Sequence, residues 1–184
     1  MTWLIAVLVV SVVVSVMRGG KLSNLPDIYA RGWWLLFIGF GMQIVANSVD
    51  SARLAVALLL TSYVVLLITV WMNRAEAGMW IAGIGLLMNF TVITLNNGMP
   101  VMEESIQLAG GGSDIVFGAK HVMLDESSRF AFLADVIPLP GSVISLGDVF
   151  LAVGLGVFIE DQLKQPLRLF RHRVQGTPGS AADR

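Results

Sequence analysis

The chain has 184 residues, of which 55% are hydrophobic and 14% charged, and its formal net charge is −1. Its mean hydropathy of +0.76 is far above that of a typical soluble domain. The absence of cysteine excludes disulfides, thiolate metal sites, iron–sulfur clusters and a cysteine nucleophile.

Long apolar blocks along the chain predict membrane-spanning helices. Four blocks contain no charged residue, and a fifth contains only Asp148. Each block is about 16 to 20 residues long, close to the roughly 20 residues with which a helix crosses the hydrocarbon core of a bilayer. The predicted spans are residues 2–17, 33–49, 54–73, 77–95 and 143–159. The sequence therefore predicts an all-α membrane protein, a five-helix transmembrane bundle with one long extracytoplasmic loop.

The distribution of basic residues predicts the orientation of this bundle. Arg18 and Lys21 follow the first block and no basic residue precedes it, which favours a retained span with its N-terminus outside. Nine Lys and Arg residues then fall on the cytoplasmic side and three outside. The positive-inside rule predicts a multi-pass protein of the bacterial cytoplasmic (inner) membrane, with its N-terminus outside and its C-terminus cytoplasmic.

The segment between the fourth and fifth spans, residues 96–142, is much longer than the other links. Connections of this length usually carry function or are disordered. It holds six acidic residues against two basic ones, and its stretches 115–124 and 130–137 are too apolar to stay in water. We expect them to lie on the membrane surface or to cap the bundle. Residues 1–159 form the predicted membrane domain, and residues 160–184 form a basic cytoplasmic tail.

Polar side chains recur in the outer half of three predicted spans. Gln43 and Asn47 share one helical face, and Asn89 and Asn96 share another. Either these amides hydrogen-bond neighbouring helices, or they line a polar pocket that opens outward beneath the loop. The candidate binding residues of such a pocket are Gln43, Asn47, Asn89, Asn96, Asn97 and Asp148.

Asp148 has two interpretations. In the pattern Ser145-Leu-Gly-Asp148 the serine caps a helix and the acid reaches back to a free backbone amide, a capping box. Alternatively, the turn at 137–141 brings Asp135 close to Asp148, so that the two carboxylates share one proton and serve as the general acid and base of a hydrolase.

The densest polar cluster of the loop comprises Lys120, His121, Asp125 and Glu126. The spacing of His121 and Asp125 is that of one helical turn, which suits proton transfer or, with a third ligand, a metal. A solvated face of the loop explains the same residues. Lys120, His121 and Asp125 are retained as candidate binding residues, and no metal or cofactor is predicted.

Residues 144–154, Ile-Ser-Leu-Gly-Asp-Val-Phe-Leu-Ala-Val-Gly, resemble the segment of lipoprotein signal peptidases that carries their second catalytic aspartate. This resemblance implies a catalytic role for Asp148. At the end of an earlier span those enzymes carry a further aspartate, whereas this chain reads Asn96-Asn-Gly-Met-Pro100 there.

A wider set of motifs is similar to a bacterial family of polytopic membrane proteins of unknown function. The set comprises Arg18-Gly-Gly-Lys21, Asn96-Asn-Gly-Met-Pro100, Lys120-His-Val-Met-Leu-Asp125, Phe132-Leu-Ala-Asp135 and Ser145-Leu-Gly-Asp148. The resemblance implies a topology and no activity.

These observations favour a non-enzymatic membrane component that binds a lipid, a peptide or a partner membrane subunit through its external loop and outer pocket. Homo-oligomerisation is an alternative form of partnership, and no nucleic-acid partner is expected. The competing hypotheses are an intramembrane hydrolase that uses Asp135 and Asp148, and a small transporter. Against a transporter, Asp148 is the one charge inside the predicted spans, and no inverted repeat is evident.

Overall fold

The computed structural model describes residues 2–28, 30–110 and 121–164. Five long helices form the body of the molecule, and a short 3-10 helix, η1 (Leu22–Asp27), follows the first of them. The long helices are α1 (Thr2–Met17), α2 (Trp33–Asn47), α3 (Ala52–Met72), α4 (Met79–Asn96) and α6 (Leu146–Lys164).

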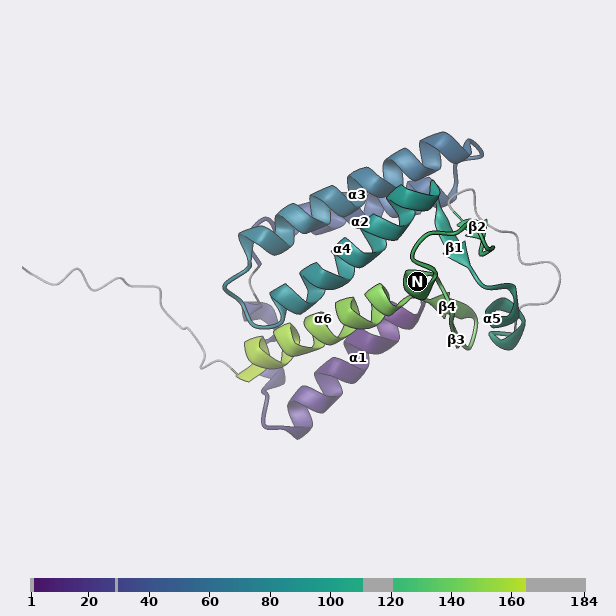
Figure 1. Cartoon of the computed structure of the whole chain (residues 1–184). Coiled ribbons are helices and arrows are strands. Elements are labelled where there is room, and N and C mark those ends of the chain that lie inside the picture. Colours follow the sequence, from purple (N-terminus) through teal and green to yellow (C-terminus); the bar gives the residue numbers. More distant parts are fainter. Residues whose placement is uncertain (1, 29, 111–120, 165–184) are drawn as a thin grey trace, which may run out of the picture.

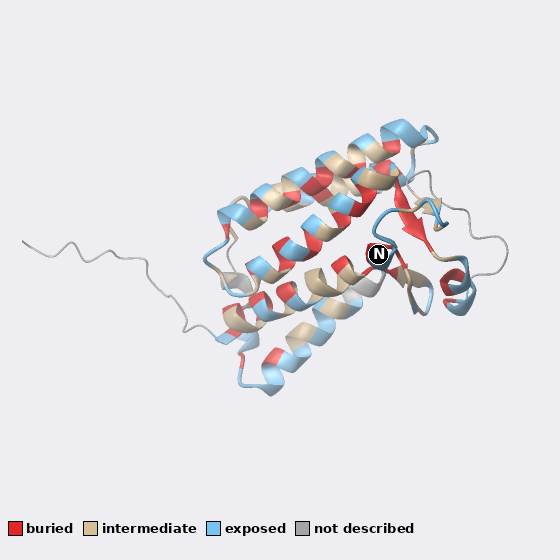
Figure 2. Ribbon diagram, viewed as in Figure 1, coloured by how far each residue is buried: buried red, intermediate tan, exposed pale blue. Residues whose placement is uncertain are grey.

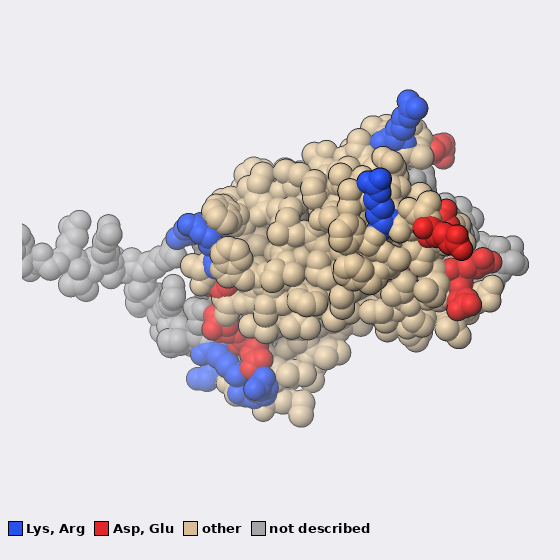
Figure 3. Space-filling view, viewed as in Figure 1, with Lys and Arg blue, Asp and Glu red and all other residues tan. Residues whose placement is uncertain are grey.

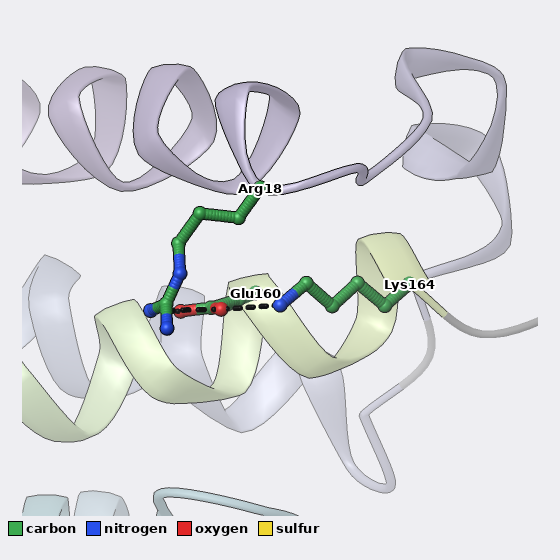
Figure 4. A network of polar contacts seen from close by, with 3 residues as sticks. All are labelled: Arg18, Glu160 and Lys164. Atoms are coloured by element: carbon green, nitrogen blue, oxygen red, sulfur yellow. Dashed lines mark hydrogen bonds and ion pairs between the residues drawn. The ribbon is translucent and has the colours of Figure 1, made fainter.

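The long helices pack side by side in the order α2, α3, α4, α6, α1 (Figure 1). α1 and α6 run in the same direction. Their C-terminal ends lie together, as shown by the ion pair at 3.1 Å between Arg18, just after α1, and Glu160, near the end of α6. Lys164 contacts the same carboxylate at 2.6 Å (Figure 4). The two helices therefore start at the same end of the molecule.

Glycines allow α4 and α6 to approach closely. A Cβ atom placed on Gly85 would overlap the backbone of α6, and one on Gly154 would overlap the backbone of α4 at Ala82. A Cβ on Gly147 would collide with the amide of Asn89. Small residues at such crossings let helix backbones pack without intervening side chains. This crossing sets the distance between the polar residues of the two helices.

The described part of the segment between α4 and α6 is folded across one end of the helices, and we call it the cap (residues 97–110 and 121–145). Its described elements are β1 (Met99–Val101), α5 (Glu103–Leu108), β2 (His121–Met123), the 3-10 helix η2 (Ala131–Leu133), β3 (Ile137–Leu139) and β4 (Ser142–Ile144). β1 pairs with β2 in parallel, and β3 with β4 in an antiparallel hairpin. The backbone of Asp135 joins β1, since its N–H bonds the Pro100 carbonyl at 2.9 Å and its carbonyl accepts from Met102 at 3.0 Å.

The core and the surface of the helices are both apolar. Leu59, Leu66, Leu86 and Ile93 are buried where α3 meets α4. The outer faces nevertheless carry many exposed large hydrophobic side chains, among them Phe37 at 71% exposure. Figure 2 shows exposed positions recurring along the long helices. On the face seen in Figure 3, charged side chains gather toward the two ends, and the surface between them is uncharged.

The predicted five-helix transmembrane bundle is wrong. Among the described residues, two helices, α3 and α4, are long and apolar enough to cross a membrane. The apolar helices 6–17 and 33–47 are shorter, and α6 carries Asp148, Glu160 and Asp161. The chain is also not all-α, because the described part of the cap contains two small sheets. The cap also contains the short helix α5. The predicted tail lies outside the described residues from position 165 onward.

Candidate functional site

A cavity of about 330 Å³ lies beneath the cap, between the helices. Its lining comes from α2, α3, α4 and α6 and from four parts of the cap. The polar lining residues are Gln43, Asn47, Tyr63, Asn89, His121, Asp135, Ser142 and Asp148. This volume falls within the range of small-molecule sites, about 300 to 1,000 Å³.

All polar side chains that line the cavity lie in its part nearer the cap, together with the apolar Leu59, Ile93, Met99 and Val143, and the part farther from the cap is apolar. Along α2, Asn47 is nearest the cap, Gln43 is about one turn deeper and Phe40 deeper still. On α6, Leu151 lies about one turn below Asp148. The deep wall is completed by Leu66 of α3 and Leu86 of α4, which are both buried. The cavity is therefore amphipathic along the helix axes.

Asn89 connects the two central helices at the polar level. Its Nδ2 donates to Asp148 Oδ1 at 2.8 Å, and its Oδ1 accepts from Ser145 Oγ at 2.9 Å. It is 2% exposed, so both bonds are made away from bulk water. Tyr63 of α3 lines the same cavity. One amide thus joins α4 and α6.

Asp148 forms the capping box that the sequence predicts. Its Oδ2 accepts from the Ser145 N–H at 3.2 Å, and its own N–H donates to Ser145 Oγ at 3.1 Å. The acid sits in the first turn of α6, where a negative charge also suits the helix dipole. Asp148 both caps helix α6 and lines the cavity. Its role in the capping box therefore does not exclude a role in binding.

Asp135 reaches the same cavity from the cap. Hydrogen bonds to Pro100 and Met102 fix the backbone of Asp135, and Asp135 is 8% exposed. Asp135, Asp148 and Tyr63 all line this cavity. The fold thus brings to one cavity two carboxylates that are thirteen positions apart in the sequence. Together with the amides they offer acceptors and donors to a hydroxyl- or amine-bearing group.

Several candidate residues lie elsewhere. Asn96 holds the cap, since its Nδ2 donates to the Arg129 carbonyl at 2.9 Å and its Oδ1 accepts from the Arg129 N–H at 2.8 Å. Asn97 ends α4 in the left-handed conformation, with φ of 53°. Asp125 is exposed and closes a turn with Ser127. Lys120 lies outside the described residues.

Two polar lining residues, Tyr63 and Ser142, were not predicted. Tyr63 is embedded in an apolar run of α3, and its one signal is a polar atom within a predicted span. Ser142 follows the turn of the β3–β4 hairpin and carries no pattern of its own. Within the described ranges, no three His, Asp or Glu side chains lie close enough together to hold a metal ion.

Comparison with known proteins places the chain among relatives without assigned activity. A family model described as a family of unknown function (DUF5317) matches residues 27–160. An uncharacterized protein of Thermotoga maritima is 29% identical over 161 residues, which cover 84% of this chain and 89% of the relative. No solved structure matches. The short likeness to lipoprotein signal peptidases finds no support in these matches.

Proposed function

This chain belongs to the DUF5317 family of unknown function, and we propose that it is a non-enzymatic integral membrane component that binds the polar part of a ligand in the cavity beneath its cap. The observation that carries the proposal is the convergence of polar residues on one cavity. Gln43, Asn47, Asn89 and Asp148 come from three helices, and His121 and Asp135 come from the cap.

Membrane insertion is supported by the surface of the helices. α3 and α4 have the length and composition of membrane spans. Exposed apolar side chains such as Phe37, Val10 and Val153 would form a much larger hydrophobic surface than a soluble monomer carries. In a bilayer the same side chains contact lipid, and the cap and the opposite charged end face water.

The proposed location is the bacterial cytoplasmic membrane, with the cap and the N-terminus outside. This orientation is supported by the basic residues in the described part of the chain: Arg18, Lys21, Arg31, Arg74 and Lys164 lie at the end opposite the cap, and Arg53 and Arg129 lie on the cap side. The cavity then lies at the level of the outer leaflet. Its size suits a lipid headgroup, a peptide side chain or a terminal group of a partner subunit, and not a folded domain.

The test compares ligand retention by two variants of the full chain. Gln43→Leu replaces a half-buried amide of the cavity by an apolar side chain of similar size. Thr61→Val makes a similar change on the exposed face of α3, where the hydroxyl bonds its own helix. Native mass spectrometry of protein purified in mild detergent identifies what stays bound. We expect the wild type and Thr61→Val to retain the same species and Gln43→Leu to lose it. Equal retention by all three proteins would reject the cavity as the binding site.

A hydrolase is a second candidate, favoured by the presence of Asp135 and Asp148 on one cavity. Two close carboxylates can hold one proton, so that one activates water and the other protonates a leaving group. Under this alternative Asp135→Asn and Asp148→Asn each abolish cleavage of peptides that join a polar and an apolar segment, with unfolding midpoints close to wild type. New peptide termini measured by mass spectrometry decide the matter. Cleavage that persists in both variants removes the aspartate mechanism.

A further inference from the structure

We infer that the ligand of this cavity is a membrane lipid with a primary ammonium headgroup, which enters sideways between α2 and α6. The inference rests on the proposed function and specifies its ligand. Three observations carry it: the division of the cavity into polar and apolar parts, the arrangement of its two side walls, and the sign of the charges that line it.

The cavity matches an amphipathic molecule. Polar groups line it at the level of Asn47, Gln43 and Asp148, and apolar side chains line it deeper in the helices, at Phe40 and Leu151. A free polar solute would leave this deep apolar part unmatched. A headgroup beneath the cap with its chain running toward the membrane centre satisfies both parts.

The walls of the cavity leave a lateral route. α3 and α4 pack on each other and contribute buried residues to its lining, whereas α2 and α6 stand on either side. α2 packs on α3, and α6 packs on α4 and α1; in the part of the chain that the structure describes, α2 and α6 do not form one of the main helix-packing contacts. Phe40 and Leu151 face the same cavity from these two helices. The acyl chain of a lipid can therefore leave the cavity between α2 and α6 and remain in the bilayer.

The charges select the headgroup. The charged lining residues within the described ranges are Asp135 and Asp148, accompanied by His121, and no Lys or Arg is among them. A primary ammonium donates three hydrogen bonds, which carboxylates and the amide oxygens of Gln43 and Asn47 can accept. A phosphoglycerol headgroup would bring a net negative charge and no positive one to the carboxylates. Trimethylated ammonium offers no N–H donor. Phosphatidylethanolamine has the required chemistry.

The binding test uses the full chain in nanodiscs of phosphatidylcholine, doped equally with phosphatidylethanolamine and phosphatidylglycerol. Native mass spectrometry measures which lipid is retained. We expect phosphatidylethanolamine to be enriched over either other lipid by about tenfold, a modest difference in binding free energy. Asp135→Asn combined with Asp148→Asn abolishes the preference, whereas Asp125→Asn, which removes an exposed acid of the same cap, preserves it. Equal retention of the three lipids would overturn the inference.

A second arm separates the lipid from a free amine. Glycerophosphoethanolamine and ethanolamine carry the same ammonium without acyl chains, and we expect neither to displace the bound lipid at equal concentration. Displacement by either compound would show that the apolar part of the cavity is not used, and would overturn the lipid assignment.

The route is tested without relying on a variant. Phosphatidylethanolamine with a photoreactive group in its acyl chain should crosslink to peptides of α2 and α6 that contain Phe40 and Leu151. Crosslinks confined to the outer faces, near Ile44 and Val153, would overturn the lateral route; both residues are at least 50% exposed.

The retention experiments also separate this inference from the proposed function. If a species other than phosphatidylethanolamine is retained in a Gln43-dependent manner, the lipid inference fails and the binding function stands.

Discussion

Asn73 holds the backbone of Arg31 through both atoms of its side-chain amide. Its Oδ1 accepts from the Arg31 N–H at 2.7 Å, and its Nδ2 donates to the Arg31 carbonyl at 2.9 Å. Nδ2 also lies 2.7 Å from the Thr69 carbonyl in the last turn of α3. Asn73 is 4% exposed, and it ties the entry of α2 to the end of α3. Asn96 holds Arg129 by the same pair of bonds at the opposite end of the molecule.

Replacing Asn73 by alanine should destabilise the protein by about 1 to 3 kcal/mol, because partly buried backbone groups of Arg31 lose their partners. Chemical unfolding in detergent measures the change. Ser48→Ala is the control, since its exposed hydroxyl bonds a carbonyl of its own helix. A loss for Asn73→Ala no larger than that of Ser48→Ala would contradict the role given to this amide.

Gly147→Ala should be strongly destabilising, since its Cβ would occupy the position of the Asn89 amide and approach the Gly85 carbonyl. We expect a loss of about 1 to 3 kcal/mol, typical of overpacking. Gly41→Ala is a matched control within α2, because a Cβ there meets nothing within 4 Å. It should be neutral, or stabilising by about 0.5 to 1 kcal/mol through helix propensity. Equal effects at both positions would refute the close crossing of α4 and α6.

Ser145→Ala removes the capping hydroxyl of α6 and the donor to Asn89 Oδ1. The loss of an N-cap typically costs about 0.5 to 2 kcal/mol. Ser145→Thr keeps the hydroxyl and should recover most of this stability. Unfolding midpoints of the two variants check the expectation, and a threonine variant no better than alanine would mean that the hydroxyl is not the stabilising group.

Asp125 should titrate below its usual range. Hydrogen bonds from the Ser127 and Ser128 side chains and from the Ser127 backbone lower its pKa. A carboxylate with a lowered pKa in the folded state stabilises the fold above its unfolded pKa, and this contribution is lost as the pH falls through the folded value. NMR titration of the Asp125 carboxyl measures it. Ser127→Ala should raise the pKa toward normal, and an unchanged value would contradict the hydrogen-bonded turn.

Glu160→Gln should weaken the contact between α1 and α6 in a salt-dependent manner. Arg18 and Lys164 both pair with this carboxylate, and their side chains are 63% and 39% exposed (Figure 4). Such pairs contribute little and are screened by salt. The difference in unfolding midpoint between variant and wild type should therefore shrink as ionic strength rises. A difference independent of salt would indicate a packing effect in place of an ionic one.

The apolar blocks of the sequence locate the long helices but not the end of α6 or the cap. The predicted spans 33–49 and 77–95 correspond to α2 (Trp33–Asn47) and α4 (Met79–Asn96) to within a few residues. α6 continues beyond the predicted span, which ends at residue 159, to Lys164. Its last turns are stabilised by Glu160, which pairs with Lys164 one turn later and with Arg18. The strands of the cap are three residues long, too short for an alternating pattern to be recognised.

Helical spacing identified much of the cavity, because residues three or four apart share a face. Gln43, Asn47 and Asn89 were predicted on this basis, Asp148 was predicted from its position at the outer start of the last span, and the four residues line the cavity together. The same reasoning misjudged Asn96, whose face is turned to Arg129, since periodicity does not predict which part of a loop a side chain meets. The approach of Asp135 depends on pairing between Val101 and Asp135 within the cap, a contact between residues far apart in the sequence.

Because α1 and α6 run in the same direction, the proposed orientation of the protein in the membrane can be tested at its N-terminus. The first turns of α1, at Ala6 and Val7, line a groove together with Leu139 and Pro140 of the β3–β4 hairpin. A small epitope fused ahead of residue 2 would thus project beside the cap, as the N label in Figure 1 indicates. Protease access to that epitope in intact spheroplasts and in inverted vesicles reports where the mouth of the cavity opens, without altering a single residue near it.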